Sequence, residues 1–193
     1  MNLANKTKLP KCSALFLFFT LVSTLIVQFS VQSVSADQKT IVVPDEYFTI
    51  TEAVANASPG DTVFVRNGVY HENVRIDKPL LVVGEDNEKT AVIGEGNVND
   101  GNVFILAAIN VTLEGFTIRS ADYSTPKQYA NGINIRGDNC TVRDNNIMNT
   151  FWGVLCPIQS YVLITENNIT GNLKEGIRFY GGSFNTISEN FIA

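Results

Sequence analysis

The chain has 193 residues, with 14 basic side chains against 19 acidic ones, a net charge of −5 and a hydrophobic fraction of 45%. This acidic balance provides no basic surface by which the protein would bind nucleic acid or anionic lipid, so we expect neither as a partner.

Residues 1–36 have the pattern of a secretory signal peptide. Three lysines precede an apolar core from Ala14 to Val27, and small residues close the segment at Ala36. An uncleaved membrane anchor is the alternative, but the core is shorter than the roughly 20 apolar residues that a spanning helix needs. We therefore expect this segment to be removed and the protein to be secreted, periplasmic or displayed at the cell surface. Contact with a membrane would come only through this segment or through an anchor beyond the present sequence.

Residues 37–61 predict a strand followed by a short helix. The strand is Thr40 to Val43, and the helix opens with a capping box in Thr49-Ile-Thr-Glu52. We expect this N-terminal capping helix to lie across the open end of a solenoid and to cover its apolar strand edges. The apolar face of the helix is formed by Ile50, Ala53, Val54 and Ala57.

From residue 132 onward the sequence repeats itself. Each repeat begins with a glycine, at Gly132, Gly153 and Gly176, and the glycines lie 21 and 23 residues apart. A fixed period of this length indicates stacked units, each of which buries its apolar face only against its neighbours. Residues 62–118 follow the same pattern less regularly.

Within each repeat, apolar and polar residues alternate over short stretches, which is the pattern of strands. The first repeat predicts three strands, centred near residues 134, 141 and 147. We therefore predict an all-β fold, a right-handed single-stranded parallel β-helix with rungs of about 22 residues, over residues 62–193. The side chains expected to point inward include Val63, Val65, Val74, Ile76, Ile133, Ile135, Val142, Val154, Ile164, Ile177 and Ile187.

Cys140 and Cys156 also fall at inward positions. A disulfide between them is one interpretation, but they belong to different strands of successive rungs, and the sequence does not bring their Cα atoms within bridging range. We favour two buried free thiols, because cysteine in a core behaves as a small hydrophobic residue.

An asparagine recurs at the turn between the second and third strands of each repeat. Asparagine tolerates the left-handed conformation that such a turn requires, and stacked amides can hydrogen-bond as a ladder. We interpret this ladder as structural, and its members are Asn145, Asn167 and Asn190. The acidic residue before each asparagine is expected to form a solvated stripe, with calcium binding as a lesser alternative; these residues are Asp144, Glu166 and Glu189.

The spacing between rungs is interrupted once. Ile118 and Ile133 lie 15 residues apart, whereas the equivalent later spacings are 7 and 8 residues. We expect the excess to be an insertion from about Asp122 to Ala130. The sequence stops at Ala193 within a predicted third strand, so we expect a solenoid truncated at its C-terminus, a fragment of a longer protein.

Four asparagines beyond residue 36 match the Asn-X-Ser/Thr pattern of N-glycosylation, namely Asn56, Asn110, Asn139 and Asn168. They are candidate acceptors in an exported protein. Threonine in strands also produces such matches by chance, and Pro59 weakens the first of them.

Four stretches carry a family resemblance: Ile41-Val-Val-Pro-Asp, Ser58-Pro-Gly-Asp-Thr-Val, Gly68-Val-Tyr-His-Glu-Asn-Val and Lys78-Pro-Leu-Leu-Val-Val-Gly-Glu. They are similar to motifs of the right-handed β-helix proteins grouped with periplasmic copper-binding NosD, especially the cell-surface and secreted versions common in archaea. More widely, they resemble pectin-lyase-like carbohydrate-binding and sugar-hydrolase domains. The resemblance covers about residues 40–193. It implies the fold but no single activity, because lyases, hydrolases, epimerases, esterases and proteins without known chemistry share such repeats.

The NosD resemblance implies a link to copper, which binds through His, Met and Cys. Beyond residue 36 the chain has one histidine, His71, which is distant in sequence from Met148. We therefore predict neither a metal site nor a cofactor. Gly68-x-Tyr70-x-Glu72 also resembles the opening motif of pectin methylesterases, where it is a structural turn. The carboxylates, glutamines and arginine expected of that family have no matching stretch here, so the catalytic residues stay unassigned.

The segments before the three repeat glycines would stack at one corner of the solenoid. Sugar rings are bound by flat aromatic faces with nearby carboxylates and amides, and loops on a rigid scaffold are the usual place for such groups. We expect Tyr129 and Trp152 to be partly exposed as a glycan platform; the alternative is that both pack under the insertion as a satellite cluster. The candidate ligand-binding residues are Asp122, Tyr123, Lys127, Tyr129, Trp152, Lys174 and Glu175.

Two functions remain open. The first is an exported or cell-surface β-helix that binds glycans or other surface partners without catalysis in this segment. The second is a polysaccharide-active enzyme, a lyase, glycoside hydrolase or epimerase, whose catalytic rungs lie partly outside the segment. We favour the first, because carboxylates that cleave glycosidic bonds must converge within about 5 to 10 Å and the sequence indicates no such pair.

Overall fold

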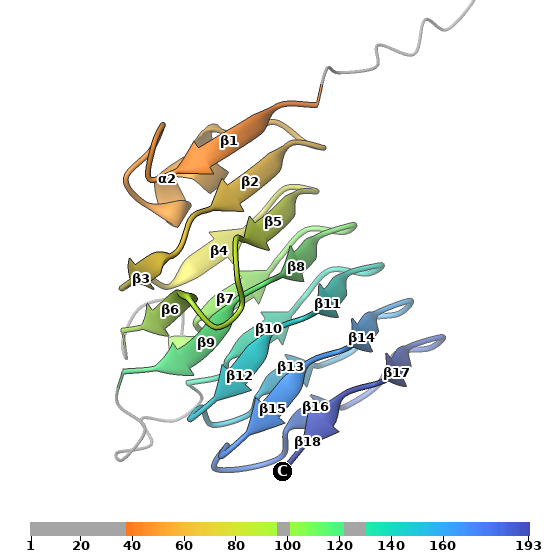
Figure 1. The fold of residues 1–193 in the computed structure, drawn as a ribbon. Coiled ribbons are helices and arrows are strands. Elements are labelled where there is room, and N and C mark those ends of the chain that lie inside the picture. The colour runs from red at the N-terminus through yellow and green to blue at the C-terminus, as the bar shows by residue number, and fades with distance from the viewer. Residues whose placement is uncertain (1–37, 96–100, 122–129) are drawn as a thin grey trace, which may run out of the picture. The chain divides into compact units, whose positions relative to one another are not determined.

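The computed structural model describes residues 38–95, 101–121 and 130–193. The predicted signal peptide and residues 122–129 of the predicted insertion lie outside these ranges. In the described part, short strands and one α-helix form a stack of turns, and the chain visits three sheets in succession (Figure 1). Neighbouring strands within each sheet run parallel. The predicted all-β parallel β-helix is confirmed.

The three sheets are named here by their number of strands. The seven-strand sheet contains, in spatial order, β1 (Thr40–Val43), β2 (Thr62–Val65), β5 (Leu81–Gly84), β8 (Thr112–Glu114), β11 (Thr141–Arg143), β14 (Leu163–Thr165) and β17 (Thr186–Ser188). The five-strand sheet contains β4 (Val74–Ile76), β7 (Phe104–Leu106), β10 (Ile133–Ile135), β13 (Val154–Cys156) and β16 (Ile177–Phe179). The six-strand sheet contains β3 (Gly68–Tyr70), β6 (Thr90–Gly94), β9 (Thr117–Ser120), β12 (Asn146–Met148), β15 (Asn168–Thr170) and β18 (Phe191–Ile192).

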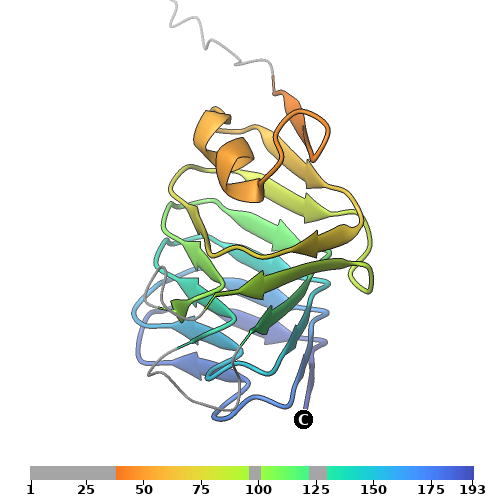
Figure 2. The same ribbon diagram turned by 90° about the vertical axis from the view of Figure 1, so that its left-hand side faces the viewer.

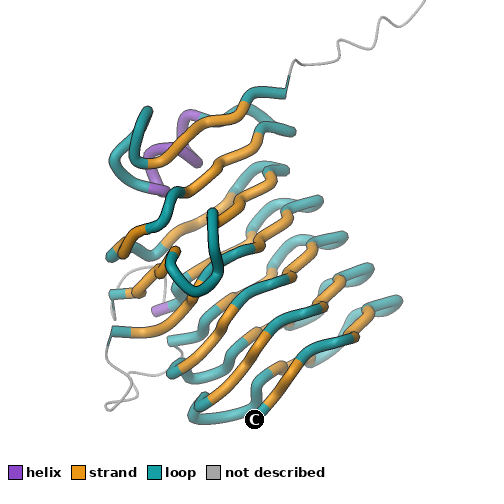
Figure 3. The backbone as a smooth tube through the Cα atoms, viewed as in Figure 1, coloured by secondary structure: helices purple, strands orange, loops and turns teal. Residues whose placement is uncertain are grey.

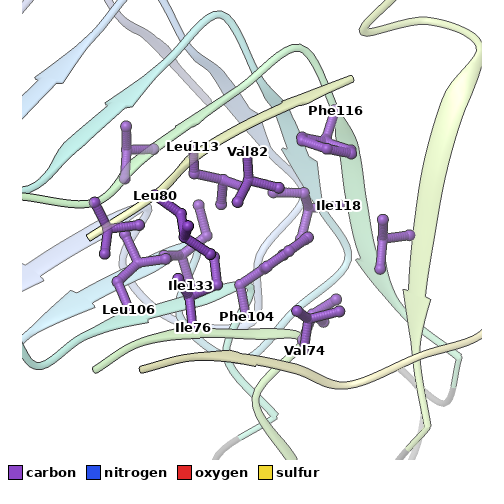
Figure 4. Close-up of a cluster of buried hydrophobic side chains, with 14 of the residues drawn as sticks. Val74, Ile76, Leu80, Val82, Phe104, Leu106, Leu113, Phe116, Ile118 and Ile133 are labelled. Carbon is purple, nitrogen blue, oxygen red and sulfur yellow. The ribbon is translucent and has the colours of Figure 1, made fainter. Parts of the chain in front are cut away.

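Successive turns are in register, so equivalent residues lie directly above one another along the stack (Figure 3). Val142, for example, pairs with Leu113 on one side and with Ile164 on the other. Alternate strand positions point inward and form one continuous hydrophobic core (Figure 4). The predicted inward residues that the core buries are Val63, Val65, Val74, Ile76, Ile133, Ile135, Val142, Val154 and Ile164.

Two residues predicted to be inward are less covered than the others. Ile177 packs against the core but is only half-buried, and Ile187 is 50% exposed. Ile187 does occupy the inward register, because it pairs with Ile164. Its strand, β17, ends the seven-strand sheet in this structure and has a neighbouring strand on one side only. The predicted inward register of Ile187 is therefore confirmed, and the side chain is exposed because no described strand covers the other side of β17.

The repeat glycines lie where successive rungs approach closely. A Cβ atom at Gly153 would lie 2.4 Å from the carbonyl oxygen of Gly176 and 2.6 Å from Cγ2 of Ile169. Neither neighbour can move away without opening the stack, because one is backbone and the other is a buried core side chain. The spacing of the glycines therefore follows the spacing of the rungs.

The helix α2 (Ile50–Asn56) covers the first rung of the stack (Figure 2). Its N-cap is Thr49, whose hydroxyl accepts a hydrogen bond from the Glu52 N–H at 3.1 Å. The Glu72 carboxylate accepts hydrogen bonds from two other N–H groups in the first turn of the helix, those of Ile50 and Thr51, both at 2.9 Å. The helix buries its apolar face, as its periodicity predicts.

The corner asparagines are hydrogen-bonded along the stack; Asn145 and Asn167 are buried, and Asn190 is half-buried. Nδ2 of Asn145 donates to Oδ1 of Asn167 at 3.1 Å, and Nδ2 of Asn167 donates to Oδ1 of Asn190 at 2.9 Å. Each amide also donates to two backbone carbonyls; for Asn167 these belong to Val142 and Thr165. The ladder thus ties three rungs together through atoms that would otherwise be unpaired inside the protein.

The left-handed residue at this corner is the acid before each asparagine. Asp144, Glu166 and Glu189 have φ of 52°, 57° and 56°, whereas none of the three ladder asparagines has a positive φ. The expectation that asparagine supplies the left-handed conformation is therefore wrong. The physical reason is that the turn must direct the amide inward to its partners, which leaves the preceding, solvated residue to carry the strained torsion.

Cys140 and Cys156 are both buried and both free. Burial raises the pKa of each thiol, and it raises that of Cys156 to about 11. The two side chains therefore fill the core as neutral thiols rather than as a disulfide.

Candidate functional site

The outer face of the five-strand sheet carries one aligned row of side chains. The strand register places the middle residue of each strand beside its counterpart, and the flanking residues of these strands point into the core. Along the stack, the outward row is Arg75, Ile105, Asn134, Leu155 and Arg178.

The centre of this row is buried although it faces away from the core. Ile105, Asn134 and Leu155 are 1%, 6% and 8% exposed. Oδ1 of Asn134 has no hydrogen-bond partner in the structure. A sheet with covered side chains on both faces contrasts with the seven-strand sheet, whose outward residues Thr141 and Arg143 remain half-buried or exposed.

Four residues converge at the end of this row and are named here the Trp152 cluster: Trp152, Glu175, Arg178 and Tyr180. The Trp152 indole Nε1–H donates to Glu175 Oε2 at 2.6 Å across neighbouring rungs. Arg178 Nη1 donates to the other carboxylate oxygen, Glu175 Oε1, at 2.9 Å. The single carboxylate therefore joins an aromatic and a cationic side chain.

The aromatic rings of the cluster are held at right angles. The Trp152 and Tyr180 centroids lie 6.3 Å apart at an interplanar angle of 88°, and Phe151 packs edge-on against Trp152 at 4.7 Å. Arg178 lies over the Tyr180 ring, with Cζ 4.7 Å from its centroid, as in a cation–π contact. Trp152 is half-buried and Tyr180 is 58% exposed, so the cluster presents aromatic surface to solvent.

The charges of the cluster are set by its hydrogen bonds. The Glu175 backbone N–H and the Trp152 indole N–H donate to the carboxylate and hold the pKa of Glu175 below its ordinary value of 4.5. The carboxylate is consequently ionised at neutral pH and neutralises the Arg178 guanidinium. Nε of Arg178 is buried and has no hydrogen-bond partner among the described residues.

The backbone before Trp152 is anchored to the neighbouring rungs. The Trp152 carbonyl accepts from the Gly132 N–H at 3.0 Å and lies 2.9 Å from the Thr150 hydroxyl. That hydroxyl is also 2.7 Å from Oδ1 of Asn172. These contacts fix the direction in which the indole leaves the corner.

The structure brings together only part of the predicted binding residues. Trp152 and Glu175 are in direct contact, and Lys174 lies next to Glu175 with its side chain exposed. The remaining candidates, Asp122, Tyr123, Lys127 and Tyr129, lie outside the described residues, so the Tyr129 half of the expected platform stays a prediction. Arg178 and Tyr180 were missed, although aligning the strands behind Gly153 and Gly176 would have placed Arg178 beside Leu155.

Comparison with known proteins places the chain in a family. Residues 54–193 match the family described as periplasmic copper-binding protein (NosD). The protein belongs to the NosD family.

Solved structures share the right-handed parallel β-helix of this NosD-family chain. Pectin methylesterase PemA from Erwinia chrysanthemi superposes with a TM-score of 0.51 at 14% identity, over 74% of this chain and 53% of that chain. A pectin methylesterase crystallised with a hexasaccharide gives a TM-score of 0.52 at 14% identity, over 68% and 54%.

Curated relatives of the NosD-family chain are similar over part of their length. A pectinesterase/pectinesterase inhibitor from Ficus pumila var. awkeotsang is 30% identical over 140 residues, which is 66% of this chain and 26% of the relative. The uncharacterised protein YwoF from Bacillus subtilis is 28% identical over 111 residues, which is 51% of this chain and 24% of the relative. The chain thus spans about a quarter of the length of these curated relatives and about half the length of the solved structures.

The family description raises the question of a copper site in this chain. His71 is exposed and follows β3, Met148 lies in β12, and the two cysteines are buried with raised thiol pKa values. The described ranges contain no group of three or more His, Cys, Asp or Glu side chains able to hold a metal ion. The donor set present in the described residues does not fit copper, which requires converging imidazole, thioether or thiolate ligands.

Proposed function

We propose that the protein is an exported β-helix that binds glycans at the Trp152 cluster. The observation that carries this proposal is the pair of partly exposed rings, Trp152 and Tyr180, held at right angles around the Arg178–Glu175 ion pair. The cluster is built on neighbouring rungs of a rigid stack, so its groups are arranged before a ligand arrives.

The chemistry of the cluster suits a sugar ring. Sugars present apolar C–H faces, which aromatic rings cover, and hydroxyl groups, which both donate and accept hydrogen bonds. The Arg178 side chain is 40% exposed and its guanidinium has N–H donors beyond the one that binds Glu175, and the Glu175 carboxylate retains acceptor capacity beyond its two hydrogen bonds. Both hydrogen-bonding roles of a hydroxyl therefore have a partner beside an aromatic face.

Export is supported by the N-terminal sequence pattern and by the family, which is described as periplasmic. Among the residues that the structure describes, no helix has the length and apolar character needed to cross a bilayer. A surface or periplasmic location would place the cluster where extracellular polysaccharides occur.

A polysaccharide-active enzyme is the second candidate, because several relatives are named pectinesterases. The Trp152 cluster has a single carboxylate, and Glu175 already binds Trp152 and Arg178. Glycosidic cleavage uses two carboxyl groups separated by about 5 to 10 Å. Catalysis by this protein would therefore draw on groups outside the cluster. Release of reducing ends or methanol from the titrated polysaccharides would support this candidate.

The test is a calorimetric titration of neutral and acidic polysaccharides against the wild type and three variants. Trp152→Ala and Tyr180→Ala should weaken binding at least about tenfold, since each removes an aromatic surface worth about 1.5 kcal/mol. Tyr161→Ala is the matched control, because Tyr161 is also 58% exposed but stacks on Phe184. Binding that survives both cluster variants, or a panel of polysaccharides that gives no binding, contradicts the proposal.

A further inference from the structure

The four Asn-X-Ser/Thr matches have different surroundings in the folded protein. All four asparagines are exposed, so exposure alone does not separate them. What differs is the side-chain nitrogen Nδ2, the atom to which an N-linked saccharide is attached. Its contacts therefore decide which positions accept a saccharide without disturbing the fold.

Two of the four Nδ2 atoms already donate one of their two hydrogens. Nδ2 of Asn139 donates to Oδ1 of Asn110 at 2.6 Å, and Nδ2 of Asn56 donates to the Glu52 carbonyl at 2.9 Å. A saccharide on Asn139 would be attached to an atom in contact with the neighbouring rung. A saccharide on Asn56 would compete with a hydrogen bond of helix α2.

Asn110 and Asn168 keep Nδ2 available. In the structure, neither Nδ2 atom donates to a described residue. Asn110 uses Oδ1 as the acceptor of the Asn139 amide and projects from a turn with φ of 57°. Asn168 lies on the outer side of β15, where Ile169 points into the core, and Thr170 lies on the same outer side.

We propose that Asn110 and Asn168 are the N-glycosylated positions of this protein, and that Asn56 and Asn139 are not. The donor would be an oligosaccharide linked to a polyisoprenoid phosphate or pyrophosphate, used by an oligosaccharyltransferase. In this transfer Nδ2 of the asparagine bonds to the anomeric carbon, the bond from that carbon to the phosphate oxygen breaks, and one amide proton passes to a base of the transferase. The lipid phosphate or pyrophosphate is the leaving group. The proposal rests on the export proposed above and is independent of glycan binding at the Trp152 cluster.

Peptide mass spectrometry of the protein purified from its own cells tests the assignment. Peptides that contain Asn110 and Asn168 should carry a saccharide mass, and those with Asn56 and Asn139 should not. Asn168→Gln and Thr112→Val should each remove one saccharide, and Thr112→Val leaves the left-handed Asn110 in place. Asn139→Gln is the control and should change neither modified peptide.

Cell fractionation separates this inference from the proposed export. Exported protein without a saccharide on Asn110 and Asn168 overturns the assignment alone. Equal modification of Asn139 also overturns it, because the difference in Nδ2 contacts would then have no effect. Unmodified protein found only in the cytoplasm overturns both the assignment and export.

Discussion

Lys78 reaches from the turn before β5 to the end of helix α2, where its Nζ donates to the Val54 carbonyl at 2.9 Å. The same ammonium group donates to the carbonyls of Ala55 and Ala57 at 2.7 and 2.9 Å. These carbonyls lie at the helix C-terminus, where backbone acceptors have no partner within the helix. With Glu72 at the other end, two side chains of the first rung hold the capping helix in place.

Lys78→Met should loosen this cap. The variant keeps much of the apolar stem but loses three charge-assisted hydrogen bonds, so we expect the free energy of unfolding to fall by about 2 kcal/mol. Urea denaturation followed by circular dichroism measures this change. Lys174→Met, which alters an exposed lysine, is the control and should stay within about 0.5 kcal/mol of the wild type. An equal effect of both variants would contradict the role of Lys78.

Ile164→Asp should prevent folding, whereas Thr165→Asp should be tolerated far better. The two residues are neighbours in β14, but Ile164 is fully buried in the core and Thr165 is half-buried on the outer face. A buried, unpaired carboxylate costs several kcal/mol, and one that reaches solvent does not. Yield of folded protein and the denaturation midpoint measure the difference. Equal damage by the two variants would contradict the burial of Ile164.

Asn167→Ala should lower the free energy of unfolding by about 1 to 3 kcal/mol. The change removes the middle amide of the ladder and leaves the Asn145 amide and the carbonyls of Val142 and Thr165 with fewer partners. Asn168→Ala is the control, measured in protein produced without N-linked saccharide, because the Asn168 side chain is exposed and outside the ladder. Unchanged denaturation midpoints for Asn167→Ala would show that the ladder adds nothing to stability.

The environment of Trp152 should titrate with Glu175. Because the folded pKa of this carboxyl group is lowered from 4.5, its stabilising contacts are fully present above that value and are lost as the pH falls through the folded pKa. We expect the fluorescence of Trp152, the only tryptophan, to change with a midpoint below pH 4.5. Glu175→Gln should abolish this transition. A midpoint above 4.5, or one unaffected by the substitution, would contradict the contact.

The two cysteines should resist alkylation in the folded protein. At pH 8 the thiol of Cys156, with a pKa raised to about 11, is almost entirely protonated, and Cys140 is buried as well. We expect iodoacetamide to modify neither residue natively and both in denaturant without a reducing agent. A mass lower by two hydrogen atoms, with no alkylation in denaturant, would instead show a disulfide.

The sequence predicted the rungs because their determinants are local. Glycine at positions such as Gly153 is required by the close approach of backbone, and alternation within each strand follows from the pleat. The alternation correctly placed Ile187 in the inward register, but its exposed fraction depends on a neighbouring rung rather than on the alternation. The left-handed conformation was assigned to Asn167, one residue after Glu166, which adopts it. Both residues lie in the same turn, and only the hydrogen bonds of the Asn167 amide determine which of them takes the positive φ.

The candidate site was harder to predict than the fold. Trp152 and Glu175 were identified as the residues before two repeat glycines, but their contact can be predicted only if the alignment of the two rungs is known. Arg178 and Tyr180 face outward, where the repeat imposes no residue type. Only the strand register brings Arg178 beside Leu155, whereas Glu175 lies three residues before Arg178 in the same rung.

The alternation in the five-strand sheet separates the inward residues, which stabilise the fold, from the outward residues, which do not pack in the core. Val154 and Ile177 pack against the core, while Arg178, one residue after Ile177, faces away from it and reaches solvent in part. Since each rung touches only its neighbours, an exchange at one outward position leaves distant rungs untouched. Outward residues of such a protein can therefore be substituted one rung at a time, in evolution or in design, without a change to the core residues.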